Sequence, residues 1–492
     1  MDKRLLTSLF LGLGSSLGAQ ATVRLPALVG SHMVLQRDAP VPVWGWAAPG
    51  EQVVVTFRGH DYPAAPAATG RWQVALPATP AGGPYNLIIK GQNTITIEDV
   101  LVGDVWLASG QSNMELPLRD RNAPAPGAYP LILNAEQEVA TANFPQIRQF
   151  TVKKVVAYQP QTENEGYGWQ VCSPAMAGSF SAVGYFFARD LYQLYHVPIG
   201  LISSPWGGTP AEAWVSAEAL QKLPDFQAPV AAMAGRPARP EPLDKDAQNT
   251  PTVLYNGMIA PLQPYAIKGV IWYQGESNTG RGAQYRTLFP ALIRDWRARW
   301  GSELPFIFVQ LANYTKALPL PGPSDWAEVR EAQAMALALP RTGMAVALDL
   351  GDPDDIHPAN KQDVGHRLAL AARQVAYGDK KVVAAGPTFQ SMQVRGSQVN
   401  LKFSNVGTGL VLKSGTTTLT GFAVAGADGQ FHWAGATLNG RSEVVLTCAA
   451  VPTPVAVRYA WANNPLGNLY NQEGLPAAPF RTDAPVGTTS RP

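Results

Sequence analysis

The chain has 492 residues, of which 46% are apolar and 15% are charged, as expected of a water-soluble globular protein with more than one domain. Its 38 basic and 36 acidic residues are interleaved along the sequence and give a formal net charge of +2. This balance excludes an electrostatic footprint for nucleic acid or an anionic membrane. The two cysteines, Cys172 and Cys448, are too few for a disulfide framework, and two separately buried thiols are favoured over one long-range bridge.

The N-terminus has the three parts of a secretory signal peptide. Met1 to Arg4 is charged, Leu5 to Leu17 is apolar, and Ala19-Gln20-Ala21 supplies small residues for cleavage. The apolar stretch is shorter than the roughly 20 residues that span a bilayer. The sequence predicts a signal peptide at 1–21 and an exported protein, periplasmic or extracellular, with no membrane insertion after cleavage.

The region 22–98 alternates short β-type runs with turn clusters. Val41 to Trp46, Val53 to Phe57 and Trp72 to Leu76 are such runs, and Pro49-Gly50 and Gly82-Gly83-Pro84 are turn signals. No stretch of the region has the period of an amphipathic helix. This pattern predicts an N-terminal β-sandwich domain.

From Asp99 onward, apolar strand-like runs alternate with helical segments, which is typical of a parallel sheet covered on both faces. The predicted strands are Val100 to Ala108, Ile199 to Ser203, Gly269 to Tyr273, Phe306 to Gln310 and Met344 to Asp349. The predicted helices are Ser181 to Tyr195, Tyr285 to Trp300, Trp326 to Leu337 and Lys361 to Val375. We predict a doubly wound α/β domain over 99–383.

Two stretches of this domain are predicted to be surface loops or lids. Asn122 to Pro130 and Leu223 to Gln248 are rich in Pro and Ala and show no clear period. After about Ala384 the pattern returns to β, as in Val399 to Phe403 and Glu443 to Leu446. A C-terminal β-rich region with a polar tail is therefore predicted over 384–492.

Ser112 follows the predicted strand Val100 to Ala108 through Ser109-Gly110, at the sheet edge where open α/β sheets bind ligands. A serine that begins a helix there offers its hydroxyl, and it offers its backbone N–H to a developing oxyanion. In isolation, a serine in such a turn is more often a helix cap. The hydrolase elbow pattern G-x-S-x-G occurs once, at Gly14 to Gly18, inside the predicted signal peptide.

A serine nucleophile needs a base of near-neutral pKa, and His357 is the strongest of six histidine candidates. It follows the predicted strand Met344 to Asp349 and lies in Asp354-Asp355-Ile356-His357-Pro358, so one loop can hold both the base and a carboxylate that orients it. The others are assigned packing or surface roles because of their positions in β regions or helices: His32, His60, His196, His366 and His432.

Two further strand ends carry unusual polar content. Ser203 to Thr209 contains Gly207 and Gly208, whose N–H groups can approach a ligand because no Cβ intervenes. Trp272 to Asn278 places amide and carboxylate groups where a buried strand would normally end in a simple turn.

Taken together, these segments resemble the SGNH hydrolase superfamily, whose members carry four blocks that supply Ser, Gly, Asn and His. More closely, they are similar to the sialate O-acetylesterase family of carbohydrate esterases. The best matches are Gly110-Gln111-Ser112-Asn113-Met114-Glu115, Gly207-Gly208-Thr209 through Glu212-Ala213-Trp214, Tyr255-Asn256-Gly257-Met258, Gln274-Gly275-Glu276-Ser277-Asn278, and Asp355-Ile356-His357-Pro358 leading into Asn360-Lys361. The resemblance extends from the N-terminal β region to about Asp483 and implies a flavodoxin-like SGNH core.

The resemblance implies that Ser112 is the nucleophile and that His357 is the general base and then the acid. It implies an oxyanion hole formed by the N–H of Ser112, the N–H of Gly207 or Gly208, and a side chain of the third block. The superfamily has Asn there, and Gln274 is the substitute donor in this chain.

The residue that orients His357 stays open between two aspartates. The general superfamily spacing, Asp-x-x-His, selects Asp354, whereas the closer family selects Asp355. Asp354 is preferred because a spacing of three residues lets a turn fold the carboxylate back onto Nδ1. A Ser–His dyad with a backbone carbonyl orienting the imidazole is the alternative.

The same blocks contain residues expected to support the site or bind substrate: Gln111, Asn113, Glu276, Asn278, Trp206 and Trp214. An ionised Glu276 cannot donate a hydrogen bond, so it is expected to hold loops or neighbouring N–H groups in place.

The sequence therefore predicts an exported serine esterase that removes O-acetyl groups from a mono-, oligo- or polysaccharide, without a metal or an organic cofactor. The substrate alternatives are acetylated plant polysaccharides such as xylan or xyloglucan. A rival of another class is a non-catalytic carbohydrate-binding protein, suggested by two β regions and 13 tryptophans. A binding protein has no need of Ser and His at the ends of parallel strands.

Overall fold

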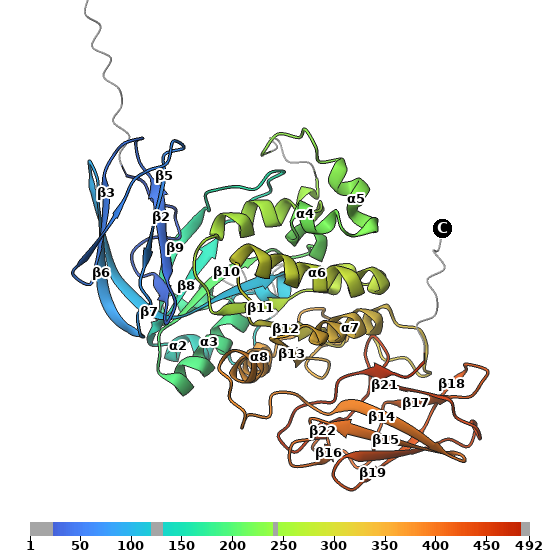
Figure 1. Ribbon diagram of the computed structural model, residues 1–492. Coiled ribbons are helices and arrows are strands. Elements are labelled where there is room, and N and C mark those ends of the chain that lie inside the picture. The colour runs from blue at the N-terminus through green and yellow to red at the C-terminus, as the bar shows by residue number, and fades with distance from the viewer. Residues whose placement is uncertain (1–22, 120–130, 240–244, 484–492) are drawn as a thin grey trace, which may run out of the picture.

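The computed structural model describes residues 23–119, 131–239 and 245–483. Figure 1 shows three regions in chain order, with a β-rich N-terminal region on one side of a central α/β layer structure and a second β-rich region below it on the other side. The predicted α/β core with flanking β regions is confirmed. The predicted signal peptide at 1–21 lies outside the described residues.

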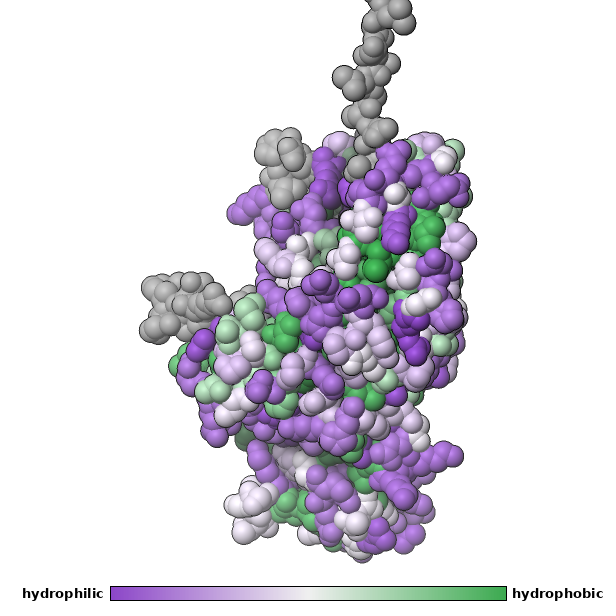
Figure 2. Space-filling model, turned by 90° about the vertical axis from the view of Figure 1, so that its left-hand side faces the viewer, coloured by the Kyte–Doolittle hydropathy of each residue, from purple (hydrophilic) through white to green (hydrophobic). Residues whose placement is uncertain are grey.

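The N-terminal region consists of short, mostly antiparallel strands. Along β3 the valines and Phe57 at alternate positions are buried, as the period of two requires. β2 pairs with β5, and β3 pairs with β4 and β6. The strands are β1 Val34–Gln36, β2 Val41–Trp46, β3 Val53–Phe57, β4 His60–Ala64, β5 Arg71–Leu76 and β6 Gly82–Lys90. Figure 2 shows this side of the molecule as mainly hydrophilic, with hydrophobic residues in small groups among polar ones.

The long strand β7, Thr94–Gly110, joins the N-terminal region to the core. Its first part pairs with β6 and β1, and its last part lies between β10 and β11 in the central sheet. The predicted domain boundary between residues 98 and 99 therefore falls inside one continuous strand. Backbone pairing holds the two regions together.

The central sheet has the strand order β13-β12-β11-β7-β10-β8-β9, parallel except for the antiparallel edge strand β9. All five predicted strands are present. The prediction missed β8 and the edge strand β9, because their sequences mix glycine, proline and polar residues with apolar ones. Besides β7, the strands are β8 Phe144–Val152, β9 Gly166–Cys172, β10 Ile199–Pro205, β11 Gly269–Tyr273, β12 Phe306–Gln310 and β13 Thr342–Val346.

Helices cover both faces of this sheet. On one face Trp106 of β7 packs edge-on against Phe187 of α3, and α3 packs against α8. On the other face Trp272 of β11 packs edge-on against Trp296 of α6, and α6 packs against α7. The helices are α1 Ser112–Glu115, α2 Ala135–Thr141, α3 Ala182–Tyr195, α4 Ala217–Leu220, α5 Pro224–Ala231, α6 Gly282–Trp300, α7 Asp325–Met335 and α8 Lys361–Ala376. The short 3₁₀ and π segments are η1 Ala177–Ser179, η2 Ala211–Trp214, η3 Ala247–Asn249, η4 Tyr255–Ile259, η5 Ala260–Leu262, η6 Glu276–Asn278 and η7 Ala336–Ala338.

Of the two predicted lids, Asn122 to Pro130 lies outside the described residues. Leu223 to Gln248 was predicted as a loop, but it begins with the helix α5, whose Phe226 and Val230 are buried. Pro224 at the first helical position starts this helix because its fixed φ suits a helix N-terminus.

The C-terminal region has its own hydrophobic core, centred on residues such as Leu401, Val424 and Val457. Two four-stranded antiparallel sheets, β14-β15-β20-β19 and β18-β17-β21-β23, are accompanied by the pair β16-β22. The strands are β14 Thr388–Arg395, β15 Gln398–Ser404, β16 Leu410–Leu412, β17 Phe422–Ala425, β18 Phe431–Trp433, β19 Gly435–Asn439, β20 Glu443–Thr447, β21 Ala456–Tyr459, β22 Leu469–Asn471 and β23 Phe480–Arg481.

Cys172 is buried in β9 and Cys448 is half-buried after β20, and both are free thiols. Among the helices in the described ranges, none combines the length and the hydrophobicity needed to cross a membrane.

Candidate active site

The segment that carries Ser112 leaves the central sheet through a turn that only glycine fits. Gly110 has a φ of +134°, and a Cβ added there would lie 2.1 Å from the carbonyl oxygen of Tyr273 in the neighbouring strand. The N–H of Gln111 donates to that same carbonyl oxygen at 2.9 Å, and the N–H of Trp206 donates to the oxygen of Gly110 at 3.0 Å. Ser112, the first residue of α1, is therefore fixed by backbone contacts to β11 and β10.

Ser112 and His357 meet at the carboxyl edge of the sheet, although 245 positions separate them in the sequence. The Ser112 Oγ lies 3.0 Å from the His357 Nε2, and the Ser112 side chain is nearly buried. This is hydrogen-bond distance, and a hydroxyl in that position can pass its proton to a neutral imidazole. The structure thus brings the two principal predicted residues together.

The carboxylate beside His357 belongs to Asp355, so the preference for Asp354 was wrong. Asp355 Oδ1 accepts the backbone N–H of His357 at 2.8 Å and lies 3.1 Å from its Nδ1. Asp354 is exposed, and its own N–H donates to Asp352 Oδ1 at 2.8 Å. The spacing argument assumed a turn that folds residue 354 back onto the imidazole, but residues 351–360 have no regular structure, and an aspartate two residues before a backbone N–H readily folds onto it.

The surroundings of His357 favour the neutral imidazole. Burial lowers the pKa of His357, the nearby Lys361 ammonium lowers it further, and the Asp355 carboxylate opposes both by raising it. A neutral ring that donates from Nδ1 to Asp355 leaves Nε2 as an acceptor for the Ser112 hydroxyl.

Two of the predicted oxyanion-hole donors remain available and two do not. Within the described residues, neither the Ser112 N–H nor the Gly208 N–H donates to a protein acceptor. The Gly207 N–H is taken, because it donates to Glu115 Oε2 at 2.6 Å. Of the two alternatives, Gly207 or Gly208, the structure therefore leaves Gly208, together with Ser112.

Gln274 is also not available as an oxyanion donor. Its Nε2 donates to the Asn278 Oδ1 at 2.7 Å and to the Thr209 oxygen at 3.3 Å, while its Oε1 accepts from the Tyr285 hydroxyl at 2.9 Å. The whole side chain is buried below the site. The predicted role is contradicted, because both amide hydrogens of Gln274 are used to join neighbouring loops.

Asn113 connects the serine segment to the histidine loop. Its Nδ2 donates to Glu276 Oε1 at 2.6 Å and to the carbonyl oxygen of Ile356 at 3.2 Å, while its Oδ1 accepts from Lys361 Nζ. Ile356 precedes His357, so the orientation of this one amide fixes the distance between the two candidate catalytic segments. The supporting role expected for Asn113 and Glu276 agrees with this geometry.

Lys361 and Glu276 are opposite charges that lie buried on either side of Asn113. Burial lowers the pKa of Lys361, and the coulombic effect of Glu276 opposes this by raising it. Burial likewise raises the pKa of Glu276, whose Oε2 has no hydrogen-bond partner among the described residues. The pair is costly to bury, so each charge depends on the other.

Of the remaining predicted residues, Gln111, Asn278 and Trp214 are buried and Trp206 is partly exposed. Gln111 Oε1 faces the N–H groups of Gly275 and Ser277 at 3.4 Å each, and Asn278 Oδ1 accepts from the Ala211 N–H at 2.9 Å. Trp214 is fully buried and packs edge-on against Trp272, so it cannot stack on a sugar. Trp206 is half-exposed, with the Lys154 ammonium 5.4 Å from the centre of its ring.

Sequence reasoning missed the contributions of Lys361 and Glu115. A lysine at the first position of α8 is unfavourable for the helix dipole, and this mismatch was a signal that the cation has a separate partner. Glu115 lies in the matched serine block, but its contacts with Gly207 and Lys154 depend on the tertiary fold.

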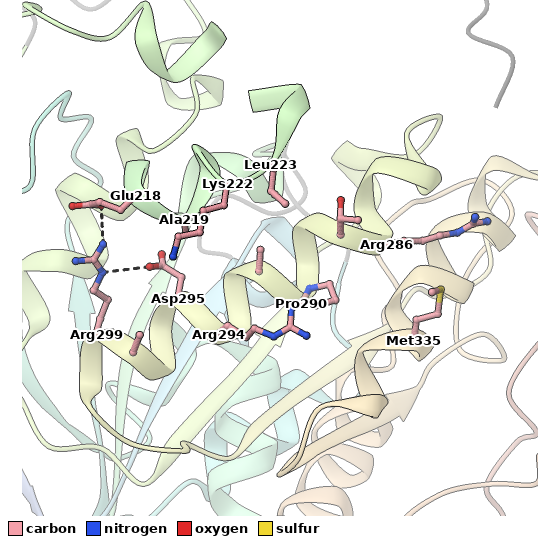
Figure 3. A pocket seen from close by; sticks show the side chains of 13 residues that line it. Glu218, Ala219, Lys222, Leu223, Arg286, Pro290, Arg294, Asp295, Arg299 and Met335 are labelled. Atoms are coloured by element: carbon pink, nitrogen blue, oxygen red, sulfur yellow. Dashed lines mark hydrogen bonds and ion pairs between the residues drawn. The ribbon is translucent and has the colours of Figure 1, made fainter. Parts of the chain in front are cut away.

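A hollow of about 780 Å³ lies away from these residues, along the outer side of α6. Figure 3 shows its side chains, among which Arg299 joins Glu218 to Asp295, while Arg286 and Arg294 extend along α6. None of the candidate site residues lines it. In the described residues, no group of three or more His, Cys, Asp or Glu side chains is arranged to hold a metal ion.

Comparisons with known proteins extend over almost the whole chain. A family model described as carbohydrate esterase, sialic acid-specific acetylesterase, matches residues 102–374. The sialate O-acetylesterase of Rattus norvegicus is 33% identical, with 94% of this chain and 95% of the relative covered. The corresponding protein of Homo sapiens is also 33% identical, with 93% and 92% covered.

A solved structure, that of XAC1771, described as a novel carbohydrate acetylesterase from Xanthomonas citri, is similar in both sequence and fold. It is 45% identical with a TM-score of 0.84, and the match covers 94% of this chain and 100% of that chain. The similarity thus takes in both flanking β regions as well as the central sheet.

Proposed function

The chain belongs to the family of sialic acid-specific carbohydrate acetylesterases and is a carboxylic ester hydrolase, and we propose that it acts as an exported serine esterase through Ser112, His357 and Asp355. One observation carries the proposal. A nearly buried serine hydroxyl lies 3.0 Å from an imidazole nitrogen whose other ring nitrogen lies 3.1 Å from a carboxylate.

In the first half of the proposed reaction, Ser112 Oγ attacks the acetyl carbonyl carbon while its proton passes to His357 Nε2. The N–H groups of Ser112 and Gly208 stabilise the negative oxygen of the tetrahedral intermediate. Asp355 stabilises the imidazolium that forms. His357 then donates this proton to the sugar oxygen as the C–O ester bond breaks. The sugar departs, and Ser112 remains acetylated.

In the second half, water attacks the acetyl-serine carbonyl and gives a proton to His357. The intermediate collapses, the proton returns to Ser112 Oγ, and acetate leaves. The family membership supports an acetylated carbohydrate as the substrate, and the sialate O-acetylesterase relatives favour an O-acetylated sialic acid.

An acetylated plant polysaccharide such as xylan or xyloglucan is the second candidate. The 45% identity to the carbohydrate acetylesterase of Xanthomonas citri supports an acetylated carbohydrate of either kind. Acetate release from a panel of O-acetylated sialosides and acetylated plant polysaccharides separates the two candidates. The preferred substrate is the one cleaved with the higher kcat/KM.

The mechanism is tested with Ser112→Ala and His357→Ala, assayed on p-nitrophenyl acetate and by fluorophosphonate labelling. We expect loss of turnover in both and loss of labelling in Ser112→Ala. His366→Ala is a matched control, because His366 also pairs with an aspartate, Asp190 at 2.6 Å, but lies on the exposed side of α8. Turnover retained by Ser112→Ala would contradict the proposed nucleophile, whereas a parent protein with neither turnover nor labelling would favour a non-catalytic, carbohydrate-binding protein.

Export is proposed from the charged, apolar and small-residue parts of residues 1–21. Mass spectrometry of the protein recovered from the periplasm and from the medium tests it. A mature N-terminus directly after Ala21 is expected. An intact Met1 in the recovered protein would contradict it.

A further inference from the structure

The loop that carries Asp355 and His357 runs from the end of β13 to the start of α8 without regular structure. It is fixed near His357 by Asn113. Its other end is fixed by two sets of hydrogen bonds that the reaction itself does not use, at Asp349 and at Gly351.

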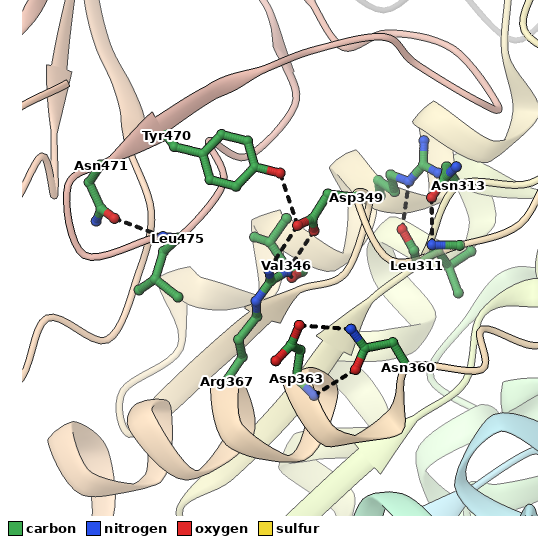
Figure 4. Close-up of polar contacts among 12 residues, drawn as sticks. Leu311, Asn313, Val346, Asp349, Asn360, Asp363, Arg367, Tyr470, Asn471 and Leu475 are labelled. Carbon is green, nitrogen blue, oxygen red and sulfur yellow. Dashed lines mark hydrogen bonds and ion pairs between the residues drawn. The ribbon is translucent and has the colours of Figure 1, made fainter. Parts of the chain in front are cut away.

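The first anchor is Asp349, whose two carboxylate oxygens accept from the Arg367 guanidinium at 2.6 and 2.8 Å. Arg367 also donates to the Val346 oxygen at 2.6 Å, so it ties the loop to the end of β13. The Tyr470 hydroxyl of β22 donates to Asp349 Oδ2 at 3.0 Å. Figure 4 shows Tyr470 of β22 and Arg367 of α8 converging on Asp349.

The second anchor is Gly351, whose N–H donates to Asn313 Oδ1 at 2.7 Å. The two segments are in such close contact that a Cβ on Gly351 would lie 2.0 Å from the Asn313 backbone oxygen. Asn313 Nδ2 donates in turn to Asn464 Oδ1 at 2.8 Å, and Asn464 Nδ2 donates to the Thr315 oxygen at 2.6 Å. Asn464 therefore sets the orientation of the amide that holds the loop.

The segment around Asn464 is itself held rigidly against the core. The fully buried Arg330 of α7 donates to the oxygens of Ala462 and Asn463 at 2.7 and 3.0 Å, and also to the oxygens of Leu311 and Ala312 at 2.8 and 2.7 Å. One guanidinium thus joins the C-terminal segment to the chain just before Asn313. Burial lowers the pKa of Arg330 to about 9, which leaves it protonated and a donor at neutral pH.

Both anchors therefore end on residues of the C-terminal β region. We propose that Tyr470 and Asn464 are positioning residues that hold the beginning of the histidine loop, so that the C-terminal region completes the esterase site. This inference rests on the proposed role of His357. It predicts that the C-terminal region acts on kcat through the position of His357 and leaves substrate binding unchanged.

The chain offers a matched pair of variants for the test. Tyr470→Phe removes a hydroxyl that reaches the histidine loop, whereas Tyr459→Phe removes a buried hydroxyl that accepts the N–H of Leu469 at 2.9 Å within the C-terminal region. Both variants lose a buried hydrogen bond, and thermal unfolding of each full-length chain reports that loss. We expect kcat to fall about tenfold or more in the double variant Tyr470→Phe/Asn464→Ala, with KM unchanged, and to stay at the parent value in Tyr459→Phe.

The rate of fluorophosphonate labelling of Ser112 provides a second readout, since it depends on His357 but not on sugar binding. If kcat falls no further in Tyr470→Phe/Asn464→Ala than in Tyr459→Phe, the inference is overturned. Asn313→Ala, alone and combined with Asn464→Ala, tests whether Asn464 acts through Asn313. The kcat losses of the two substitutions should not add, because both remove the same support from the loop. Parallel assay of Ser112→Ala separates this inference from the proposed function: turnover in that variant refutes the function, whereas an inactive Ser112→Ala with an unaffected Tyr470→Phe/Asn464→Ala refutes only the anchoring.

Discussion

Ser112 and His357 approach each other from segments of very different construction. The serine segment is an extension of β7, buried throughout residues 109–114 and fixed by backbone hydrogen bonds to β10 and β11. The histidine segment is a partly exposed loop held by side chains, among them Asn113, Asp355 and Asn313. A strand end can fix a nucleophile by backbone geometry alone, whereas an irregular loop needs a partner for each polar group.

The two flanking β regions follow the same division. The N-terminal region shares β7 with the central sheet, so it continues directly into the segment that carries Ser112. The C-terminal region contacts the histidine side through side-chain hydrogen bonds at Asp349 and Asn313. Substitutions on the serine side should therefore act through backbone displacement, and substitutions on the histidine side through lost hydrogen bonds and altered charge.

The largest effect on the histidine side is expected for Asp355→Asn. Replacing the carboxylate removes the stabilisation of the imidazolium and allows the wrong ring tautomer, and kcat should fall by about 10³–10⁴-fold. Steady-state hydrolysis of p-nitrophenyl acetate measures it. Asp354→Asn is the matched control and should keep the parent kcat, and equal losses in the two variants would contradict the assignment.

The serine side is tested by Gly110→Ala. The added Cβ meets the Tyr273 oxygen at 2.1 Å, so the backbone before Ser112 must move, and a displacement of about 1 Å can cost about 10²-fold in kcat. Gly280→Ala is the control, because Gly280 also has a positive φ, +81°, but has open space around its Cβ position. Similar kcat losses in both would show that backbone strain, rather than the close approach, limits this side.

The same division explains what the sequence could predict. Buried parallel strands read as continuous apolar runs, so β7, β10, β11, β12 and β13 were located, and with them the sheet edge where Ser112 lies. His357 was identified because one loop combined a histidine with aspartates. The choice between Asp354 and Asp355 depended on the path of an irregular loop, which has no periodic signal.

Gln274 shows a second limit. Its place in the third block suggested an oxyanion donor, but the direction of its amide is decided by Asn278 of the same block, by the Thr209 oxygen of another loop and by Tyr285 of α6. Hydrogen-bond partners in a buried network depend on several segments at once. A polar residue at the end of a buried strand has either a functional or a structural role, and the residue type alone does not decide which.

Asn113 connects the serine segment to the histidine segment, and Lys361→Met tests the buried charge pair that holds Asn113. Removing the ammonium leaves Glu276 as an uncompensated buried carboxylate, and breaking such a pair costs about 3–5 kcal/mol of unfolding free energy. Urea unfolding measures the loss. Lys361→Met/Glu276→Gln should recover part of it, since the glutamine oxygen still accepts from Asn113 without a charge, and a double variant no more stable than Lys361→Met would refute the pairing.

The smallest expected effect is a shift of the acid limb of the pH profile, in opposite directions for the two charges beside His357. The base must be neutral, so kcat/KM rises with pH through the pKa of His357, which burial holds below the usual value of imidazole. Lys361 lowers this pKa, so Lys361→Met should move the limb to higher pH. Asp355 raises it, so Asp355→Asn should move the limb to lower pH. His366→Ala should leave the limb unchanged, and shifts in the same direction for both variants would mean that a group other than His357 controls the acid limb.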